Sequence, residues 1–277
     1  AIGLDTESSG PLLVPLKGDK ESLNTYRSTL TGLSLAMPDG DAVYVPIAHR
    51  RGNAGLDGVA KLYRAIADYD GKVAIHNVKH ELLALRKGPL ESPIHSYSEL
   101  GCTQVLSWLL QKGAPTKAPY GLKKLTKQHL GMSQLMFSEV TRGKDFSELD
   151  PANERTIRYA CEDAIGALGL WQLFSPELAE RGLENLYWQT EMPVVRTYRH
   201  MEDSGMALDA ERLREVTAGF EAELVQVQAA WDWLLPVPIK MRSSKAMQWL
   251  YKEGHWDPTV LPKKASGYST EREYVEW

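Results

Sequence analysis

The sequence predicts an α/β domain followed by a mainly α-helical segment. Over residues 1–182, short apolar runs typical of strands alternate with amphipathic stretches typical of helices. From Leu183 onward the strand-like runs cease, and two long helical patterns follow one another. We therefore expect two domains, residues 1–182 and residues 183–277.

Composition limits the class of protein. The chain has 277 residues, 43% hydrophobic and 25% charged, which are ordinary values for globular domains. Its net charge of −4 argues against a bulk polyanion binder but allows a small site that grips a few phosphates. Two cysteines, Cys102 and Cys161, exclude a disulfide framework and a cysteine-based zinc site, and they favour a reducing, cytosolic setting. No run has membrane-spanning length, and no signal peptide is recognised.

The elements of the first domain follow in order along the chain. Strands are expected at residues 1–8, 30–49 and 71–77, the second split into a hairpin by the turn at 38–41. Helices are expected at residues 55–71, 78–88, 99–111 and 120–131. A cap-and-proline pair, Asp150–Pro151, predicts the start of a helix that runs to about Phe174. Its apolar positions are Ile157, Cys161, Ala164, Leu168 and Trp171.

The second domain begins with a long helical pattern over residues 183–209, interrupted at Ser204–Gly205. A second long helix is expected over residues 210–235, and the two together predict an antiparallel helical hairpin projecting from the first domain. A short helix over residues 243–254 and a polar tail complete the chain.

Two acids end the first predicted strand, in the stretch GLDTESSG. Asp5 and Glu7 are two residues apart, so their side chains leave the same face of the strand. Two carboxylates at this spacing repel each other unless a cation lies between them, and a hard divalent ion such as Mg²⁺ or Mn²⁺ satisfies both. Taken alone, the pair is better explained as a strand end with two solvated acids.

Two further pairs lie at later positions. Asn77 and Glu81 stand four residues apart where a strand gives way to a helix, a place where sites collect, although a helix cap and a first-turn acid explain them too. Tyr159 and Asp163, in the stretch YACED, share one face of the long helix. A tyrosine and an aspartate on an exposed flank are the ordinary alternative for this last pair.

Taken together and in this order, the three pairs resemble the three exonuclease motifs of the DEDD superfamily, and the tyrosine resembles its DEDDy branch. The stretch EMPVVRTYRHMEDSGMALD resembles the entry into the thumb of family A DNA polymerases, the DNA polymerase I family. Residues 242–277 resemble the thumb sequence that follows. The resemblance covers the whole chain and implies a ribonuclease H-like exonuclease domain, with a mixed sheet and flanking helices, and then the first part of a thumb. Palm and fingers motifs are expected after Trp277.

The resemblance also implies roles for the residues. Asp5, Glu7, Glu81 and Asp163 would ligate two divalent ions, Mg²⁺ or Mn²⁺, one activating water and one stabilising the departing 3′ oxygen. Tyr159, with Glu7, would orient the attacking water, and hydrolysis would proceed from 3′ to 5′ and release 5′ mononucleotides.

Two further residues would meet the substrate, and two positions depart from the family pattern. Asn77 would contact the substrate near the scissile end, and Phe137 is a candidate for stacking on the terminal nucleotides or else a core residue. Glu81 replaces the usual aspartate of the second motif and is one methylene longer, so lower activity is an open alternative. Cys102 stands where the family often has an aspartate, and we assign it no role.

Basic side chains gather in two stretches. Lys123 and Lys124, with Lys117 and Lys127, form either a solvated helix face or a track for phosphates. In the thumb-like segment Lys240, Arg242 and Lys245, with Lys263 and Lys264, are candidates for gripping the duplex backbone.

The sequence leaves three functions open. The first is a proofreading 3′–5′ exonuclease, a metal-dependent phosphodiester hydrolase. Its partners would be the single-stranded 3′ end of DNA, a primer-template duplex and the rest of the polymerase, in the cytoplasm of a bacterial or phage-infected cell and away from membranes. The second is a DNA-positioning scaffold in which Glu81 spoils the metal geometry. The third is a ribonuclease D-like RNA 3′ exonuclease.

Overall fold

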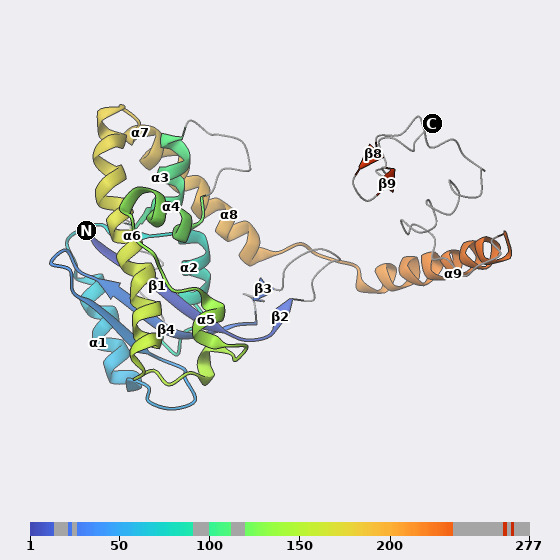
Figure 1. Cartoon of the computed structure of the whole chain (residues 1–277), viewed down its shortest axis with the longest axis horizontal. Coiled ribbons are helices and arrows are strands. Elements are labelled where there is room, and N and C mark those ends of the chain that lie inside the picture. The colour runs from blue at the N-terminus through green and yellow to red at the C-terminus, as the bar shows by residue number, and fades with distance from the viewer. Residues whose placement is uncertain are drawn as a thin grey trace. The chain divides into compact units, whose positions relative to one another are not determined.

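The computed structural model describes residues 1–13, 22–23, 27–90, 100–111, 120–234, 263–264 and 267–268. The chain divides into two compact units, Ala1–Gly205 and Met206–Trp277 (Figure 1). The first unit contains the sheet with its covering helices, and the second contains one long helix.

A five-stranded mixed sheet forms the centre of the first unit. Its strand order is β5 (Ala42–Pro46), β4 (Thr29–Ala36), β1 (Ile2–Ser9), β6 (Val73–Ile75) and β7 (Leu100–Cys102). β4 is antiparallel to its neighbours β1 and β5, whereas β6 and β7 run parallel to β1. The predicted hairpin is confirmed: Gly40 turns the chain with φ 99°, and the amide of Met37 donates to the carbonyl of Asp41 over 2.8 Å. A short pair, β2 (Leu12–Leu13) with β3 (Ser22–Leu23), lies outside this sheet.

The central strand β1 is covered on both faces, and its side chains alternate between them. Gly3 faces the helix α6 (Glu154–Glu180), because a Cβ atom on this glycine would lie 2.2 Å from the carbonyl oxygen of Ala164. Ile2 and Leu4 point the other way, into the main hydrophobic cluster. The odd-numbered residues of β1 therefore face α6.

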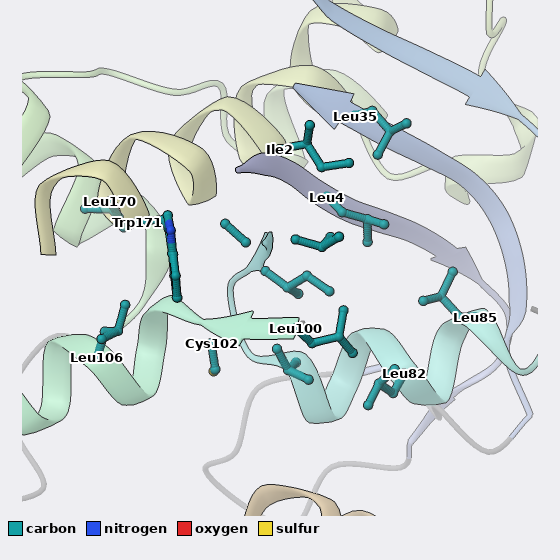
Figure 2. Close-up of a cluster of buried hydrophobic side chains, with 14 of the residues drawn as sticks. Ile2, Leu4, Leu35, Leu82, Leu85, Leu100, Cys102, Leu106, Leu170 and Trp171 are labelled. Carbon is teal, nitrogen blue, oxygen red and sulfur yellow. The ribbon is translucent and has the colours of Figure 1, made fainter. Parts of the chain in front are cut away.

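Further helical segments precede or follow α6 in the described part of the first unit. They are α1 (Gly55–Ala67), α2 (Val78–Leu85), α3 (Thr103–Leu110), α4 (Leu122–Leu130), α5 (Phe137–Thr141), η2 (Phe146–Glu148) and α7 (Glu184–Leu186). Figure 2 shows side chains of β1, β7, α2, α3 and α6 gathered in the main cluster, including Leu4, Leu82, Leu100 and Trp171. Burial of these apolar side chains holds the helices against the strands.

Two boundaries differ from the sequence prediction. The helix expected at residues 99–111 begins as the strand β7, and only Thr103–Leu110 is helical, because residues 100–102 pair with β6. The long helix α6 starts at Glu154 with Asn153 as its cap, whose side chain accepts from the amide of Arg155 over 2.9 Å. Asp150 accepts instead from the amide of Ala152 in the preceding turn, at 3.0 Å.

The helix α6 also runs further than predicted, through Pro176 to Glu180. Four of its five predicted apolar positions are buried, and the exception is Ile157, which is 37% exposed. Contacts with β1, β4, α3 and α4 hold α6 along its length. One element thus extends across the sheet and places its polar residues against β1.

The predicted helical pattern after Leu183 forms α7, a π-helical turn η3 (Tyr187–Glu191) and α8 (Met192–Ser204), and it breaks at Gly205 as expected. These segments pack with the first unit. Tyr187 and Met192 are buried in the main cluster, and the hydroxyl of Tyr187 contacts the backbone of Cys102. The compact unit ends at Gly205, and the division into domains at residue 182 stays a prediction.

The second unit contains α9 (Ala210–Leu234), which confirms the second long helix, and a short antiparallel pair, β8 (Lys263–Lys264) with β9 (Gly267–Tyr268). The helix predicted at residues 243–254 lies outside the described residues. None of the helices formed by described residues has the length and apolar character needed to cross a bilayer.

Candidate active site

Two acidic side chains of the candidate site come from β1. Asp5 and Glu7 are odd-numbered, so they leave the same face as Gly3 and point toward α6. Asp5 is partly buried and Glu7 is buried. The register of β1 against β4 shifts between Glu7 and Ser8, so the strand is irregular directly beyond the two acids.

The third motif lies on the helix that covers this face. Tyr159 and Asp163 are one turn apart on α6, and Asp163 precedes Ala164, the residue that contacts Gly3. The ring of Tyr159 is buried, and the side chain of Asp163 is 14% exposed. Since glycine permits this close approach, β1 and α6 bring the first and third motifs together.

Glu81 comes from α2, which follows β6. The parallel pairing of β1 with β6 ends at Leu4 and Ile75. Beyond it, the amide of Thr6 donates to Oε2 of Glu81 over 2.9 Å, and the hydroxyl of Thr6 contacts the same oxygen. The carboxyl group of Glu81 therefore binds β1 at Thr6, between Asp5 and Glu7.

Electrostatics show that these acids form one group. Burial, followed by the charges of Glu81, Asp163 and Glu7, raises the pKa of Asp5 well above its ordinary value. Burial and the charges of Asp163 and Glu81 do the same to the pKa of Glu7. Neighbouring carboxylates cannot all remain ionised without added positive charge. The structure thus brings together the four acids that the sequence analysis selected.

The remaining titratable groups respond to the same surroundings. Burial raises the pKa of Glu81 to about 8, although the hydrogen bonds from Thr6 oppose this rise. Burial also raises the pKa of Asp163, which Lys123 and Gln134 lower. For Tyr159, burial and then the charges of Glu7, Asp163 and Asp5 raise the pKa, so its hydroxyl stays protonated at neutral pH.

A set of polar side chains holds Asp163, and the sequence analysis missed most of it. Oδ1 of Asp163 accepts from the amide of Gln134 over 2.5 Å and lies 3.4 Å from Nζ of Lys123. Gln134 accepts from Thr126 and donates to the carbonyl of Glu162, so it joins α4 to α6. Gln134 lies between two helices without any informative spacing, and no sequence signal identifies it.

Glu162, next to Asp163, was also missed. Its carboxylate is buried, accepts from the amide of Leu135 over 2.7 Å and pairs with Arg158 at 2.7 Å. It points to the segment before α5 rather than to the other acids. Its role in this structure is to hold that segment against α6.

Phe137 and Asn77, the two predicted substrate contacts, lie at the edge of the site. Phe137 is 48% exposed, and its ring centroid is 6.1 Å from that of Tyr159. Asn77 precedes α2 with a left-handed backbone, φ 61°, and its side chain makes no capping hydrogen bond. The helix-cap explanation for the Asn77 side chain is therefore wrong, whereas its substrate contact stays a prediction.

The predicted basic residues occupy different positions relative to the site. Lys123 reaches into the site, where its Nζ lies 2.5 Å from the carbonyl oxygen of Leu135 and 4.5 Å from the ring centroid of Tyr159. Lys124 is exposed on α4. The thumb candidates Lys240, Arg242 and Lys245 lie outside the described residues, so their contact with DNA stays a prediction.

His49 is a neighbour of the site with a structural role. Its Nδ1 donates to the carbonyl of Leu149 over 3.0 Å, so its Nε2 accepts from the hydroxyl of Tyr44 at 2.7 Å. Tyr44 packs against Phe146 and Tyr159. Both ring nitrogens of His49 are therefore engaged.

The donor set has the chemistry of a divalent-metal site, although its side chains do not yet converge. Four carboxyl groups supply the oxygen ligands that Mg²⁺ and Mn²⁺ prefer, and a shared cation would relieve their mutual repulsion. Within the described ranges, no three histidine, cysteine or acidic side chains are arranged to hold a metal ion as they stand. Glu81 is turned to Thr6, and Asp163 is held by Gln134 and Lys123. The residues fit divalent ions by the chemistry of their donor atoms.

Comparisons with known proteins agree with this geometry. A family model described as a 3′–5′ exonuclease matches residues 18–179, a span that begins after Asp5 and Glu7 and includes Glu81, Tyr159 and Asp163. DNA polymerase I of Rhizobium leguminosarum is 26% identical over 246 residues, which cover 80% of this chain and 23% of that protein. The chain spans between 20% and 28% of the length of five bacterial relatives with this name.

Two solved structures share the fold. The POL domain of Pol1 from M. smegmatis, in complex with DNA primer-template and dNTP, matches 98% of this chain with a TM-score of 0.61 and 19% identity, and 40% of that chain is covered. The match with Brucella melitensis NrnC with bound Mg²⁺ covers 76% of this chain and 89% of that chain, with a TM-score of 0.51 and 17% identity.

Proposed function

Since this chain belongs to the 3′–5′ exonuclease family of family A DNA polymerases, we propose that it is the proofreading part of such a polymerase. Its fold, the predicted ribonuclease H-like exonuclease domain, agrees with this membership. The proposed reaction is hydrolysis of the 3′-terminal phosphodiester of DNA, with release of 5′ mononucleotides.

One observation carries the proposal. Four carboxyl groups and a tyrosine, drawn from β1, α2 and α6, lie close enough along the central strand for their charges to raise one another's pKa values. Burying several acids together costs free energy, so such a cluster is expected where a function requires it. In this chain the function that fits is binding of divalent cations at a phosphodiester.

Each residue of the candidate site would have a distinct role in this reaction. Asp5, Glu7, Glu81 and Asp163 would hold two divalent ions, Mg²⁺ or Mn²⁺. When bound, such ions activate water and stabilise the departing oxygen in phosphodiester hydrolysis. Because the hydroxyl of Tyr159 stays protonated, it would orient the attacking water, together with Glu7, and would not remove the proton itself.

The substrate end would lie beside Phe137. Its ring is half exposed next to Tyr159 and stacks against Phe146, so the exposed part of the ring would be the part that meets a base. Asn77, at the start of α2, would contact the substrate from the side of Glu81. Residues 183–277 would be the first part of the thumb, with Lys240, Arg242 and Lys245 on the duplex backbone.

The test is degradation of a 5′-labelled single-stranded DNA in Mg²⁺ and in Mn²⁺, beside EDTA. Asp5→Ala is the inactivating variant. Glu180→Ala, an exposed acid at the end of α6, is the matched control and should retain the activity of the starting chain. A ladder that shortens from the 3′ end, and is lost with EDTA and with Asp5→Ala, supports the proposal.

The alternatives give different outcomes. If the folded chain cleaves neither DNA nor RNA in either metal, it is a scaffold that positions DNA, and Glu81→Asp then tests whether the extra methylene is the cause. If RNA is degraded in preference to DNA, the ribonuclease D-like function replaces the proposed one.

A further inference from the structure

Lys123 contacts two residues of the candidate site, Asp163 and Tyr159. Its Nζ donates to the carbonyl of Leu135 over 2.5 Å, lies 3.4 Å from Oδ1 of Asp163 and stands 4.5 Å over the ring of Tyr159. A carbonyl, a carboxylate and an aromatic face are three kinds of group that attract an ammonium. Such a set of partners differs from the solvated helix face or phosphate track that the sequence suggests for this lysine.

The position places one positive charge beside four acids. In the described part of the chain, Lys123 is the basic side chain that lowers the pKa of Asp5, Glu7 and Asp163. Its side chain is 28% exposed, so the ammonium is partly shielded from water and acts on the acids at short range. The charge therefore offsets part of the repulsion among the carboxylates.

We propose that Lys123 is a resident counter-cation of the acid cluster, which stabilises the metal-free chain and competes with a divalent ion for Asp163. The inference rests on the proposed function for its second half, the competition. Its first half, the stabilisation, concerns the chain alone.

The contacts of Asp163 explain the competition. Its Oδ1 accepts a hydrogen bond from the side-chain amide of Gln134 and lies near the ammonium of Lys123. This oxygen therefore already has two partners within the protein. An ion that binds this oxygen of Asp163 must displace the ammonium, since two cations at one oxygen repel each other. The partial exposure of Lys123 leaves it a path to solvent.

The experiment uses the full chain and measures thermal unfolding in EDTA and across a titration of Mg²⁺ or Mn²⁺. Lys123→Met removes the charge and keeps the length of the side chain. Lys124→Met is the matched control, since Lys124 is exposed in the same turn of α4. Lys123→Met should melt several degrees lower in EDTA, and the metal concentration at the midpoint of its stabilisation should fall on the order of tenfold. Lys124→Met should change neither value.

A double-variant cycle keeps the first half testable if Lys123→Met folds poorly. The pair Lys123→Met with Asp163→Asn removes one charge of each sign, and it should recover most of the stability that Lys123→Met loses in EDTA. No recovery would overturn the stabilising role.

The metal titration separates this inference from the function on which it rests. If the starting chain is not stabilised by either metal, the proposed two-metal function fails. If the starting chain is stabilised and Lys123→Met has the same or a higher metal midpoint, the function stands and the competition is overturned.

Discussion

Buried ionisable residues outside the acid cluster also determine how this chain responds to pH. His76 directly follows β6, with Nδ1 2.9 Å from the hydroxyl of Thr103 and Nε2 2.9 Å from the carbonyl oxygen of Tyr120. Burial lowers its pKa to about 4 from an ordinary value of 6.5, although the hydrogen bond to Tyr120 opposes this. Between these two values the unfolded chain binds a proton that the folded chain does not.

The free energy of unfolding should therefore fall as pH decreases from 6.5 through 4. The shift predicts a loss of about 3 kcal/mol from His76. His76→Gln removes this titration, so the gap in unfolding free energy between the starting chain and the variant should narrow as the pH falls. Urea unfolding at several pH values measures it, with His200→Gln on the exposed face of α8 as the control. A constant gap for His76→Gln would contradict the prediction.

The sequence predicted which residues meet but not how they are held. Strand alternation correctly placed Asp5 and Glu7 on one face, and helical spacing placed Tyr159 beside Asp163. The hydrogen bonds of Glu81 to Thr6 were unpredictable, because they depend on where β6 stops pairing with β1. The contact of Lys123 with Asp163 depends likewise on how α4 packs against α6, which local patterns do not encode.

Two elements of the first unit, β1 and α6, approach each other closely where they cross at Gly3. A methyl group at Gly3 would lie 2.2 Å from the backbone oxygen of Ala164, and backbone cannot move aside as a flexible side chain can. Gly3→Ala should therefore lower the free energy of unfolding by about 3 kcal/mol. Urea unfolding at neutral pH measures the change.

The control for this prediction is Gly58→Ala. Gly58 lies within α1, and a methyl group there would meet only Cβ of Ala54 at an ordinary 3.5 Å. This variant should be stabilised by up to about 1 kcal/mol, because alanine favours helices over glycine. Equal effects of the two variants would show that helix α6 does not press on β1 at Gly3.

The helices α2 and α8 are joined by ion pairs near the second motif. Asp203 lies 3.1 Å from Arg86 of α2 and 3.2 Å from Arg199 of its own helix, and Arg199 and Asp203 are each little exposed. Asp203→Asn leaves the buried Arg199 without its carboxylate, so the free energy of unfolding should fall by about 3 kcal/mol.

An exposed pair gives the comparison for Asp203. Glu215 pairs with Arg212 on α9, and both side chains are largely exposed. Glu215→Gln should change the free energy of unfolding by less than about 1 kcal/mol, because water and salt screen surface pairs. Chemical denaturation of both variants at low and high salt measures this, and a comparable loss in the two would refute the buried role of Asp203.

Element boundaries were predicted less well than element types. The hairpin of β4 and β5 and the helices α1, α2 and α9 follow from clear periodicity and turn residues. β7 has three residues, too few for alternation to show, and only its pairing with β6 defines it. Asp150–Pro151 has the chemistry of a helix start, but Asn153 provides the same cap closer to the body of α6.

The whole molecule consists of two compact units that meet at Gly205 and Met206. The first unit contains the sheet, the main hydrophobic cluster and every described residue of the candidate site. A fragment of residues 1–205 should therefore fold by itself, with one cooperative thermal transition within a few degrees of that of the same unit in the full chain. Circular dichroism and calorimetry measure this.

Comparison with a shorter fragment tests where the compact unit ends. Residues 1–182 end where the sequence pattern changes, and this fragment lacks the buried side chains of Tyr187 and Met192. Loss of these contacts should lower the melting temperature markedly relative to residues 1–205. Equal melting of the two fragments would place the end of the unit at residue 182 instead.

The order of the elements along the chain sets the order in which they are synthesised. β1 lies at the centre of the sheet, yet α6, which completes the acid cluster, is synthesised about 150 residues later, some 10–30 s at typical ribosomal rates. Until then Asp5 and Glu7 are without the added charge of Asp163. The helix that carries Lys123 precedes α6 along the chain, so the ammonium is available before Asp163 leaves the ribosome. The repulsion between Asp163 and the acids of β1 therefore arises when its counter-charge is already present.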